Sequence, residues 1–354
     1  MRFIALLATL AIGLAAPAAA ADPAPPAGFW TVSQERLSFA PAKLSVPRRV
    51  GGAEYYETTE FSHKGEGVDT AIKYRSPDQK VLATLYVYYP SIAHSGVQAI
   101  ATDQAIRGGT RSPDIRSLGT GVAAAAGKPG VAVTADYDHY LGDNHSKAAF
   151  IKAGRWMLKL RVTGPESRSA EVAAVMKALL DGLRFEGDAR PRPAAPIAAG
   201  ECSATDRPEA GPAAGGGDAA TIAMADAAGD PPAAAARIGR DWCRTFLAVQ
   251  GQKVTVLQAT GGDRPGRDPE SVLIVLYSDG GGALEVVRLA KDKYLLLHHD
   301  IAEVKVLDSY DRLPSLAQLG RFFVEPAQIR ARVTLKPDGT AGVELPGAQG
   351  ETSP

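Results

Sequence analysis

The sequence has few cysteines, no excess of either charge and none of the common hydrolase motifs. Two of its 354 residues are cysteine, and 39 basic residues balance 39 acidic ones. Zero net charge gives no overall attraction to nucleic acid or to an anionic membrane. The Gly-x-Ser-x-Gly elbow of serine hydrolases and the His-Glu-x-x-His motif of zinc peptidases are both missing. The motifs therefore favour no enzyme class, and no nucleic-acid partner is expected.

Apolar runs long enough to span a bilayer are missing after residue 21. Before it, Arg2 is followed by an apolar run from Phe3 to Ala16 and by small residues up to Ala21, which is the pattern of a secretory signal peptide. We therefore expect residues 1–21 to be cleaved, the mature chain to have no transmembrane segment, and the protein to be periplasmic or secreted.

The two cysteines, Cys202 and Cys243, form an even pair in a chain expected to be exported, and such pairs indicate a disulfide. The bridge would close a loop of roughly 42 residues, and the alternative is two free thiols. Neither cysteine has another Cys or a His close by in the sequence, so a zinc site is not expected.

The clearest structural pattern predicts a strand, a turn and a helix over residues 148–187. Residues from Trp156 to Val162 alternate between apolar and more polar types, as in a half-buried strand. A Gly-Pro turn follows, and then six apolar residues recur on one helical stripe: Val172, Val175, Met176, Leu179, Leu180 and Leu183. We expect a helix over residues 168–184 that covers a sheet.

Similar patterns predict the rest of the first half. Strands are expected at Tyr55–Phe61, Val68–Tyr74, Val81–Tyr89, Val131–Tyr137 and Lys147–Ala153. The segment Val81–Tyr89 is apolar on both faces, which is typical of a central strand covered by two layers. A helix is expected near Gly96–Arg107, and the small residues of Gly108–Gly130 predict a long connection.

Three short segments of this half, in order, carry a family resemblance. They are Leu44-Ser45-Val46-Pro47, Leu85-Tyr86-Val87-Tyr88, and the closing run from Trp156 through Gly164-Pro165 to Leu183-Arg184-Phe185. The order resembles the PsbP-like fold, which includes periplasmic proteins of the DcrB type, and it covers residues 29–187. The resemblance implies a non-catalytic accessory or binding role by analogy alone, and no functional residue carries over.

The second half is not recognised as a member of any family. A helix is expected to begin near Ala233, with Trp242, Phe246 and Val249 on one stripe. Alternating segments from Val254 to Leu345 predict an antiparallel sheet, with a short helix near Leu313–Phe323.

We therefore predict an α+β protein of two domains, each a mainly antiparallel sheet with packed helices. The expected divisions are a signal peptide (1–21), a flexible lead (22–28), the PsbP-like domain (29–187), a disordered linker rich in Ala, Pro and Gly (188–232), a second domain (233–345) and a disordered tail (346–354).

The densest polar cluster comprises Asp136, Asp138, His139, Asp143, Asn144 and His145. Asp136 and Asp138 share one strand face, and the following turn is able to bring His145 back opposite them. Such a set is compatible with a metal-binding site, and the competing interpretation is a solvated hairpin end. The sequence assigns no metal, cofactor or catalytic residue.

Three further groups have a structural interpretation beside a functional one. His298 and His299 are neighbours on a strand, so they point to opposite faces and cannot chelate one ion together. Arg321, Arg330 and Arg332 are interpreted as a solvated sheet face, with a polyanion contact as the alternative. Tyr86, Tyr88 and Tyr89 alternate with Val and Leu, which favours packing over a stacking platform for a ligand.

These observations predict an exported, non-enzymatic protein of the cell envelope that acts through binding, in an accessory or scaffold role. The partner is expected to be an envelope protein or a cell-surface component. Two alternatives stay open: a metal-dependent hydrolase using Asp136, Asp138 and His145, and a carrier that holds a small ligand between sheet and helix.

Overall fold

The computed structural model describes residues 28–62, 66–90, 92–108, 114–187, 189–203, 207–213, 241–260, 270–290, 292–325, 327–338 and 340–345. The expected signal peptide, all but the last residue of the expected lead and the expected tail lie outside these ranges. So does the beginning of the helix expected near Ala233. No helix in the described part of the chain is long and apolar enough to cross a membrane.

Strands dominate the protein. Of the described residues, 53% lie in strands and 14% in helices, with three mainly antiparallel sheets and three α-helices. The predicted α+β class with packed helices is therefore wrong. Part of the reason is that two segments expected as a connection and as a helix, within Gly108–Gly130 and from Trp242 onward, are strands.

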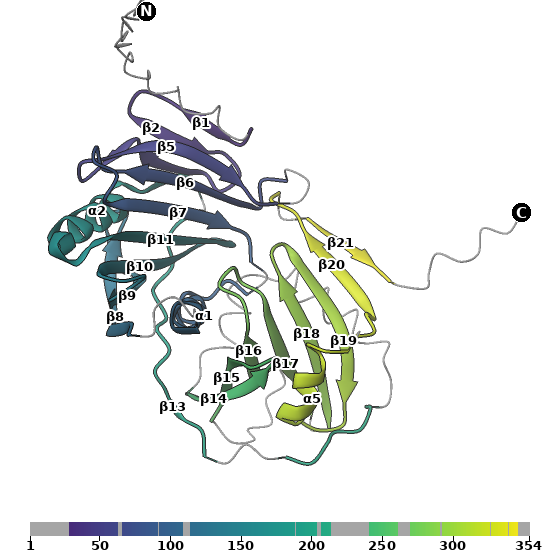
Figure 1. Ribbon diagram of the computed structural model, residues 1–354. Helices are drawn as coiled ribbons and strands as arrows, with labels where there is room; N and C mark the ends of the chain where they lie inside the picture. Colours follow the sequence, from purple (N-terminus) through teal and green to yellow (C-terminus); the bar gives the residue numbers. More distant parts are fainter. Residues whose placement is uncertain are drawn as a thin grey trace, which may run out of the picture.

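The first half is built on an eight-stranded antiparallel sheet in the order β4-β5-β6-β7-β11-β10-β9-β8 (Figure 1). Its strands are β4 (Arg49–Val50), β5 (Ala53–Glu60), β6 (Asp69–Arg75), β7 (Leu82–Tyr88), β8 (Arg116–Ala125), β9 (Lys128–Asp138), β10 (Asn144–Ala153) and β11 (Trp156–Pro165). The strands β7 and β11 lie at its centre. This position is predicted for the β7 segment, which is apolar on both faces, but not for β11, which is expected to be half-buried.

One face of this sheet is covered by the predicted helix and by a small second sheet. The helix α2 (Ser169–Gly182), preceded by a short 3₁₀ turn, η1 (Glu166–Arg168), buries the predicted stripe from Val172 to Leu180. The small sheet has the order β1-β2-β3-β12. Its strands are β1 (Trp30–Val32), β2 (Arg36–Phe39), β3 (Leu44–Pro47) and β12 (Arg184–Phe185). Phe39 of this sheet meets Trp156 edge to face, with ring centroids 5.4 Å apart. The helix prediction for residues 168–184 is confirmed.

The second half is a meander whose neighbours in sequence are neighbours in space. Its nine strands are β13 (Ala199–Glu201), β14 (Trp242–Val249), β15 (Gln252–Ala259), β16 (Glu270–Leu276), β17 (Ala283–Ala290), β18 (Lys293–Asp300), β19 (Glu303–Tyr310), β20 (Ala331–Leu335) and β21 (Ala341–Glu344). The short helix α5 (Leu316–Arg321) begins with a capping box between Ser315 and Gln318 and packs on one face.

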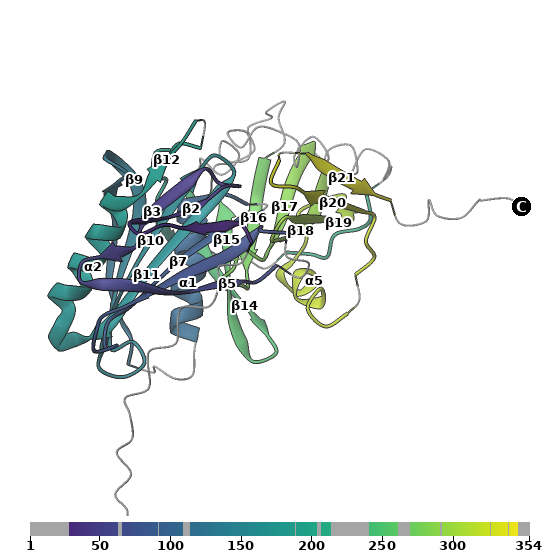
Figure 2. The same ribbon diagram turned by 90° about the horizontal axis from the view of Figure 1, so that it is seen from above.

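The helix α1 (Ser95–Gly108) lies between the two large sheets (Figures 1 and 2). It contacts β9 and β10 on one side, and Val97 and Ala101 pack with Leu257 and Ile274 of the second sheet on the other. The halves also join through the backbone, since Ala302 N–H donates to the Tyr89 carbonyl at 2.8 Å. The helix expected near Gly96–Arg107 therefore packs between the two large sheets.

The part of the expected linker that the structure describes follows both halves. Arg192 N–H donates to the Lys152 carbonyl at 2.9 Å, and Ala194 N–H to the Gly130 carbonyl at 2.8 Å. The chain then enters the second sheet as β13, which pairs in parallel with β14. Residues 189–203 are therefore not a free tether between the halves.

Candidate binding site

The structure brings Asp136, Asp138 and His145 together on β9 and β10. His145 is buried, with Nδ1 2.7 Å from Oδ1 of Asp138 and Nε2 3.1 Å from Oδ1 of Asp136. The two ring nitrogens point to opposite sides of the imidazole, so one ion cannot take both. The hydrogen bond from His145 is the main cause that holds the pKa of Asp138 below its usual value.

Two basic side chains complete this cluster. Lys147 pairs with Asp136, and Nη2 of Arg116 lies 3.1 Å from Oδ2 of Asp138. Each aspartate therefore already has a cation beside it, in a chain of alternating charge. No group of three side chains arranged to hold a metal ion occurs in the ranges that the structure describes.

The rest of the predicted polar cluster stabilises the hairpin between β9 and β10. The backbone N–H and Nδ1 of His139 lie 2.9 and 3.1 Å from Oε1 of Glu166. Asn144 donates to the Leu141 carbonyl at 3.2 Å, and the Asp143 carbonyl accepts from Glu166 N–H. This part agrees with the interpretation as a hairpin end.

His298 and His299 point to opposite faces of β18. His299 is buried and its Nε2 lies 2.8 Å from Oε2 of Glu285, which is also buried. His298 shares a short hydrogen bond with the Tyr277 hydroxyl on the α5 side, and burial lowers its pKa. The two rings therefore serve separate packing contacts.

The predicted basic row carries acidic partners. Arg321 lies 2.7 Å from Glu209, and Arg330 lies 3.4 Å from Asp308. Arg332 contacts Glu303 and Glu344 at 3.2 and 3.4 Å. The row is thus a set of surface ion pairs.

The three tyrosines of β7 and its end act mainly in packing. Tyr88 and Tyr89 are buried, with the Tyr88 hydroxyl donating to Gln98 at 3.0 Å and Tyr89 meeting Trp156 edge to face. Tyr86 is half-buried beside Lys159, whose ammonium lies 5.3 Å from the ring centroid.

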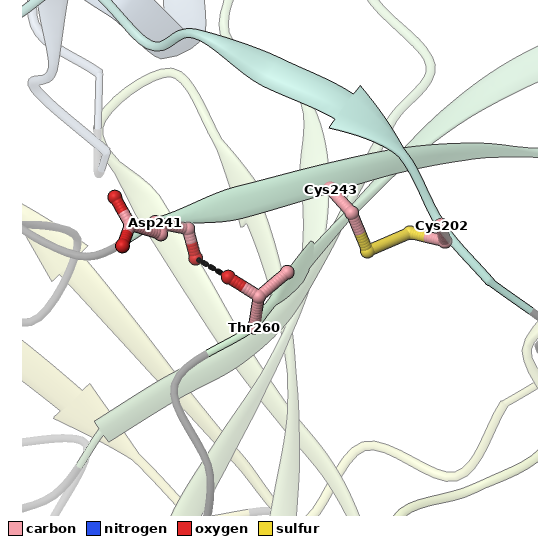
Figure 3. Close-up of a disulfide and its surroundings, with 4 residues drawn as sticks. All are labelled: Cys202, Asp241, Cys243 and Thr260. Carbon is pink, nitrogen blue, oxygen red and sulfur yellow. Dashed lines mark hydrogen bonds between the residues drawn. A yellow bond between two sulfur atoms is a disulfide. The ribbon is translucent and has the colours of Figure 1, made fainter.

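Cys202 and Cys243 form a disulfide, with Cα atoms 4.8 Å apart (Figure 3). Parallel pairing of β13 with β14 brings them together, and Cys202 N–H donates to the Arg244 carbonyl at 3.0 Å. At the same end of β14, the Thr260 hydroxyl donates to the carbonyl of Asp241, which directly precedes the strand, at 3.0 Å. The bridge fixes the connecting segment, residues 189–203, to the outer side of the second sheet.

The sequence does not predict the partly buried ion pair between the halves. Lys159 on β11 is 6% exposed, and its Nζ lies 2.5 Å from Oδ2 of Asp279, in the turn between β16 and β17. Thr102 of α1 donates to the other carboxylate oxygen of Asp279. Burial lowers the pKa of Lys159, and the charge of Asp279 opposes that shift. The only signal in the sequence is a lysine inside an apolar strand.

The strand β8 forms an open edge, which its sequence pattern does not predict either. It is ten residues long, residues 117–127 carry no charge, and Leu118 and Val122 are 50% and 52% exposed. No strand in the described residues pairs with its outer side. Irregularities near both ends leave Gly119–Ala123 in regular register with β9. An edge of this kind presents unpaired N–H and C=O groups to solvent.

A hollow of about 420 Å³ lies beside β8, between the sheet and α2. The α2-facing residues of β8 are small, with Gly121 opposite Thr134 and Ala123 opposite Ala132. Apolar side chains of α2, including Met176 and Leu180, form the facing wall. A second hollow of about 270 Å³ borders the other face of β8, next to α1 and the connecting segment.

Comparison with solved structures finds a distant likeness in fold. The chain is similar to the solution structure of cyanobacterial PsbP (CyanoP) from Synechocystis sp. PCC 6803, with 11% sequence identity and a TM-score of 0.32, over 45% of this chain and 96% of that chain. No protein-family model matches the sequence, and no curated protein matches it. The likeness agrees with the predicted PsbP-like resemblance only as a distant one in fold, and it carries no argument about function.

Proposed function

We propose that this is an exported accessory protein of the cell envelope that binds a partner polypeptide and is not an enzyme. The partner is bound at the open edge of β8, where an extended segment adds a strand to the sheet. Export is supported by the signal-peptide pattern of residues 1–21 and by the disulfide, since disulfides persist in oxidising compartments.

The observation that carries the proposal is the length of β8 compared with the other outer strands. Among the described residues, the other outer strands of the three sheets are β1, β12, β4, β13 and β21, and each of them has two to four residues. The strand β8 has ten residues. Proteins usually shorten or charge their edges to prevent unwanted pairing. The strand β8 is long and carries a single charge, Arg116 at its first residue, which favours intended pairing. The hollows on both faces leave room for side chains that alternate along an added strand.

The two alternatives have weaker support. A metal-dependent hydrolase would need Asp136 and Asp138 to exchange Lys147 and Arg116 for a metal ion. A small-ligand carrier is favoured by one observation, the hollow between α2 and the sheet. The carrier would not need the backbone groups of β8, and this difference allows the two functions to be separated.

The test places a photo-crosslinking amino acid at Val122 of the full mature chain, in envelope extract. Val343 on β21 is the matched control, because it is similarly exposed at 42% on the outer strand of the other sheet. Thr120→Pro and Gly121→Pro are made in parallel, since successive N–H groups of a strand point to opposite sides. Proline removes the N–H group of the residue it replaces. The proline variant that keeps the wild-type melting temperature has therefore lost an N–H group on the outer side of β8 and none that bonds to β9.

We expect one polypeptide to crosslink at position 122 and not at 343, and to be lost in the stable proline variant. Equal crosslinking at both positions, or a product that survives the proline, would overturn the proposal. Binding of a small molecule that the stable proline variant retains would favour the carrier.

A further inference from the structure

The hollow under α2 lies where an added strand would project alternate side chains. In an antiparallel or parallel pair, side chains of neighbouring strands line up on the same face. Residues on the α2 side of a strand paired with Gly119–Ala123 would therefore enter or border this hollow.

The lining indicates which side chain fits. The wall from α2 is mainly apolar, with Ala173, Met176 and Leu180, and the floor from β8 and β10 includes Ala123 and Ala148. The lining charges form two ion pairs, Lys147 with Asp136 and Lys177 with Asp181. Because these charges already have partners, the lining favours an uncharged occupant.

We infer that the hollow selects partner segments that carry a large apolar side chain at one α2-facing position. This inference rests on the proposed strand addition at β8 and names the kind of segment that is bound. Backbone pairing supplies affinity that is independent of sequence, while the hollow supplies the preference for sequence.

A second copy of this chain fits less well than a foreign segment. If two copies of β8 paired, the α2-facing side chains brought to the hollow would be those of Gly119, Gly121 and Ala123. None of them is large enough to fill about 420 Å³. The hollow would stay empty, and the contacts that a buried apolar side chain gains would be lost. The occupant we commit to is therefore an extended segment of another polypeptide.

The test selects a phage-displayed library of random linear peptides on the full mature chain. The enriched peptides are then measured against Ala173→Leu, which fills the hollow from α2. Ala174→Leu is the matched control, because Ala174 is the next residue of the same helix, is exposed and does not line the hollow. Both substitutions keep a good helix former in place.

We expect the peptides to share one large apolar residue and Ala173→Leu to weaken their binding at least about tenfold, the loss of roughly one buried apolar side chain. Ala174→Leu should leave binding unchanged. Unchanged binding to Ala173→Leu, with binding lost in the stable proline variant, would overturn the inference and leave the strand addition intact.

Three other outcomes would overturn more than the preference for an apolar side chain. Peptides that bind the stable proline variant as well as the wild type would overturn strand addition itself, and selection that enriches no peptide would count against both proposals. A dimer in sedimentation analysis that the stable proline variant abolishes would assign the edge to a second copy and overturn the choice of a foreign segment.

Discussion

The eight-stranded sheet is covered on its β4 side and on its α1 face, but it is open along β8. At β4 the chain turns through Gly51, where an added Cβ atom would lie 2.8 Å from the Cα of Val175 in α2. On the α1 face, the second sheet brings Asp279 onto buried Lys159. At β8 the residues from Leu118 to Val122 are exposed.

This contrast indicates how the protein divides its surface between stability and binding. The covered parts use close backbone contacts and an ion pair whose lysine is buried, so changes there affect folding. The open edge has few contacts to lose, so changes there affect only what binds. Four comparisons test this difference.

Asp279→Ala should lower the free energy of unfolding by about 3–5 kcal/mol, because it leaves the buried Lys159 ammonium without its partner. Lys159→Met should cost about 1 kcal/mol or less, since Asp279 is 33% exposed and keeps Thr102. Urea unfolding of both variants measures the asymmetry. Equal losses would mean that the pair acts as a surface contact.

Gly51→Ala should cost about 3 kcal/mol, the sum of a left-handed backbone and a clash with the α2 backbone. Gly52→Ala is the control, because Gly52 also has a positive φ but has no atom within 4 Å of the added Cβ. It should cost only about 1 kcal/mol. Thermal unfolding of the two variants checks whether α2 closes this end, and similar losses would argue against it.

Asp69, at the start of β6, makes the covered face sensitive to pH. Burial, with the charges of Glu60 and Asp300, raises its pKa from 3.8 to about 6. The folded protein therefore holds this proton more tightly than the unfolded chain. Its stabilising contribution is complete below pH 3.8 and is lost as the pH rises through about 6. Asp69→Asn should be more stable than the wild type at neutral pH, with the gain shrinking towards acid pH in denaturant titrations.

Thr120→Lys on β8 should change the free energy of unfolding by less than about 0.5 kcal/mol, because this position is exposed. The same change at Thr70, which is buried and accepts a hydrogen bond from Trp30, should unfold or strongly destabilise the protein. Melting temperatures compare the two. A large loss at position 120 would show that β8 is more tightly packed than its exposure indicates.

The sequence predicts those parts of the fold in which large apolar residues set the period. The α2 stripe was identified correctly because Val172, Val175 and Leu179 recur at helical spacing and have one layer to cover. The strand β8 was missed because Gly and Ala carry almost no hydrophobic alternation. In β14, Trp242, Phe246 and Val249 fit a helical stripe by spacing, but tertiary pairing with β15 makes the segment a strand.

The candidate site was only partly accessible to the same reasoning. Convergence of Asp136, Asp138 and His145 follows from a hairpin, which is local. The pairing of Arg116 with Asp138 depends on β8 being a strand, so it could not be foreseen. The alternation from Trp156 to Val162 places Lys159 on the solvent-exposed face of a half-buried strand. In the structure this face lies under α1 and the second sheet, which only the tertiary fold reveals.

The position of α1 between the sheets also sets an order of assembly. Val97 and Ala101 pack against residues that lie more than a hundred positions later in the chain. A chain that has emerged only as far as residue 187 can complete its first sheet. The side of α1 that carries Val97 and Ala101 stays exposed to solvent until the second sheet folds against it. Synthesis or translocation that stalls in that interval should leave an aggregation-prone, protease-sensitive intermediate, and α1 is covered only when β15 and β16 have docked.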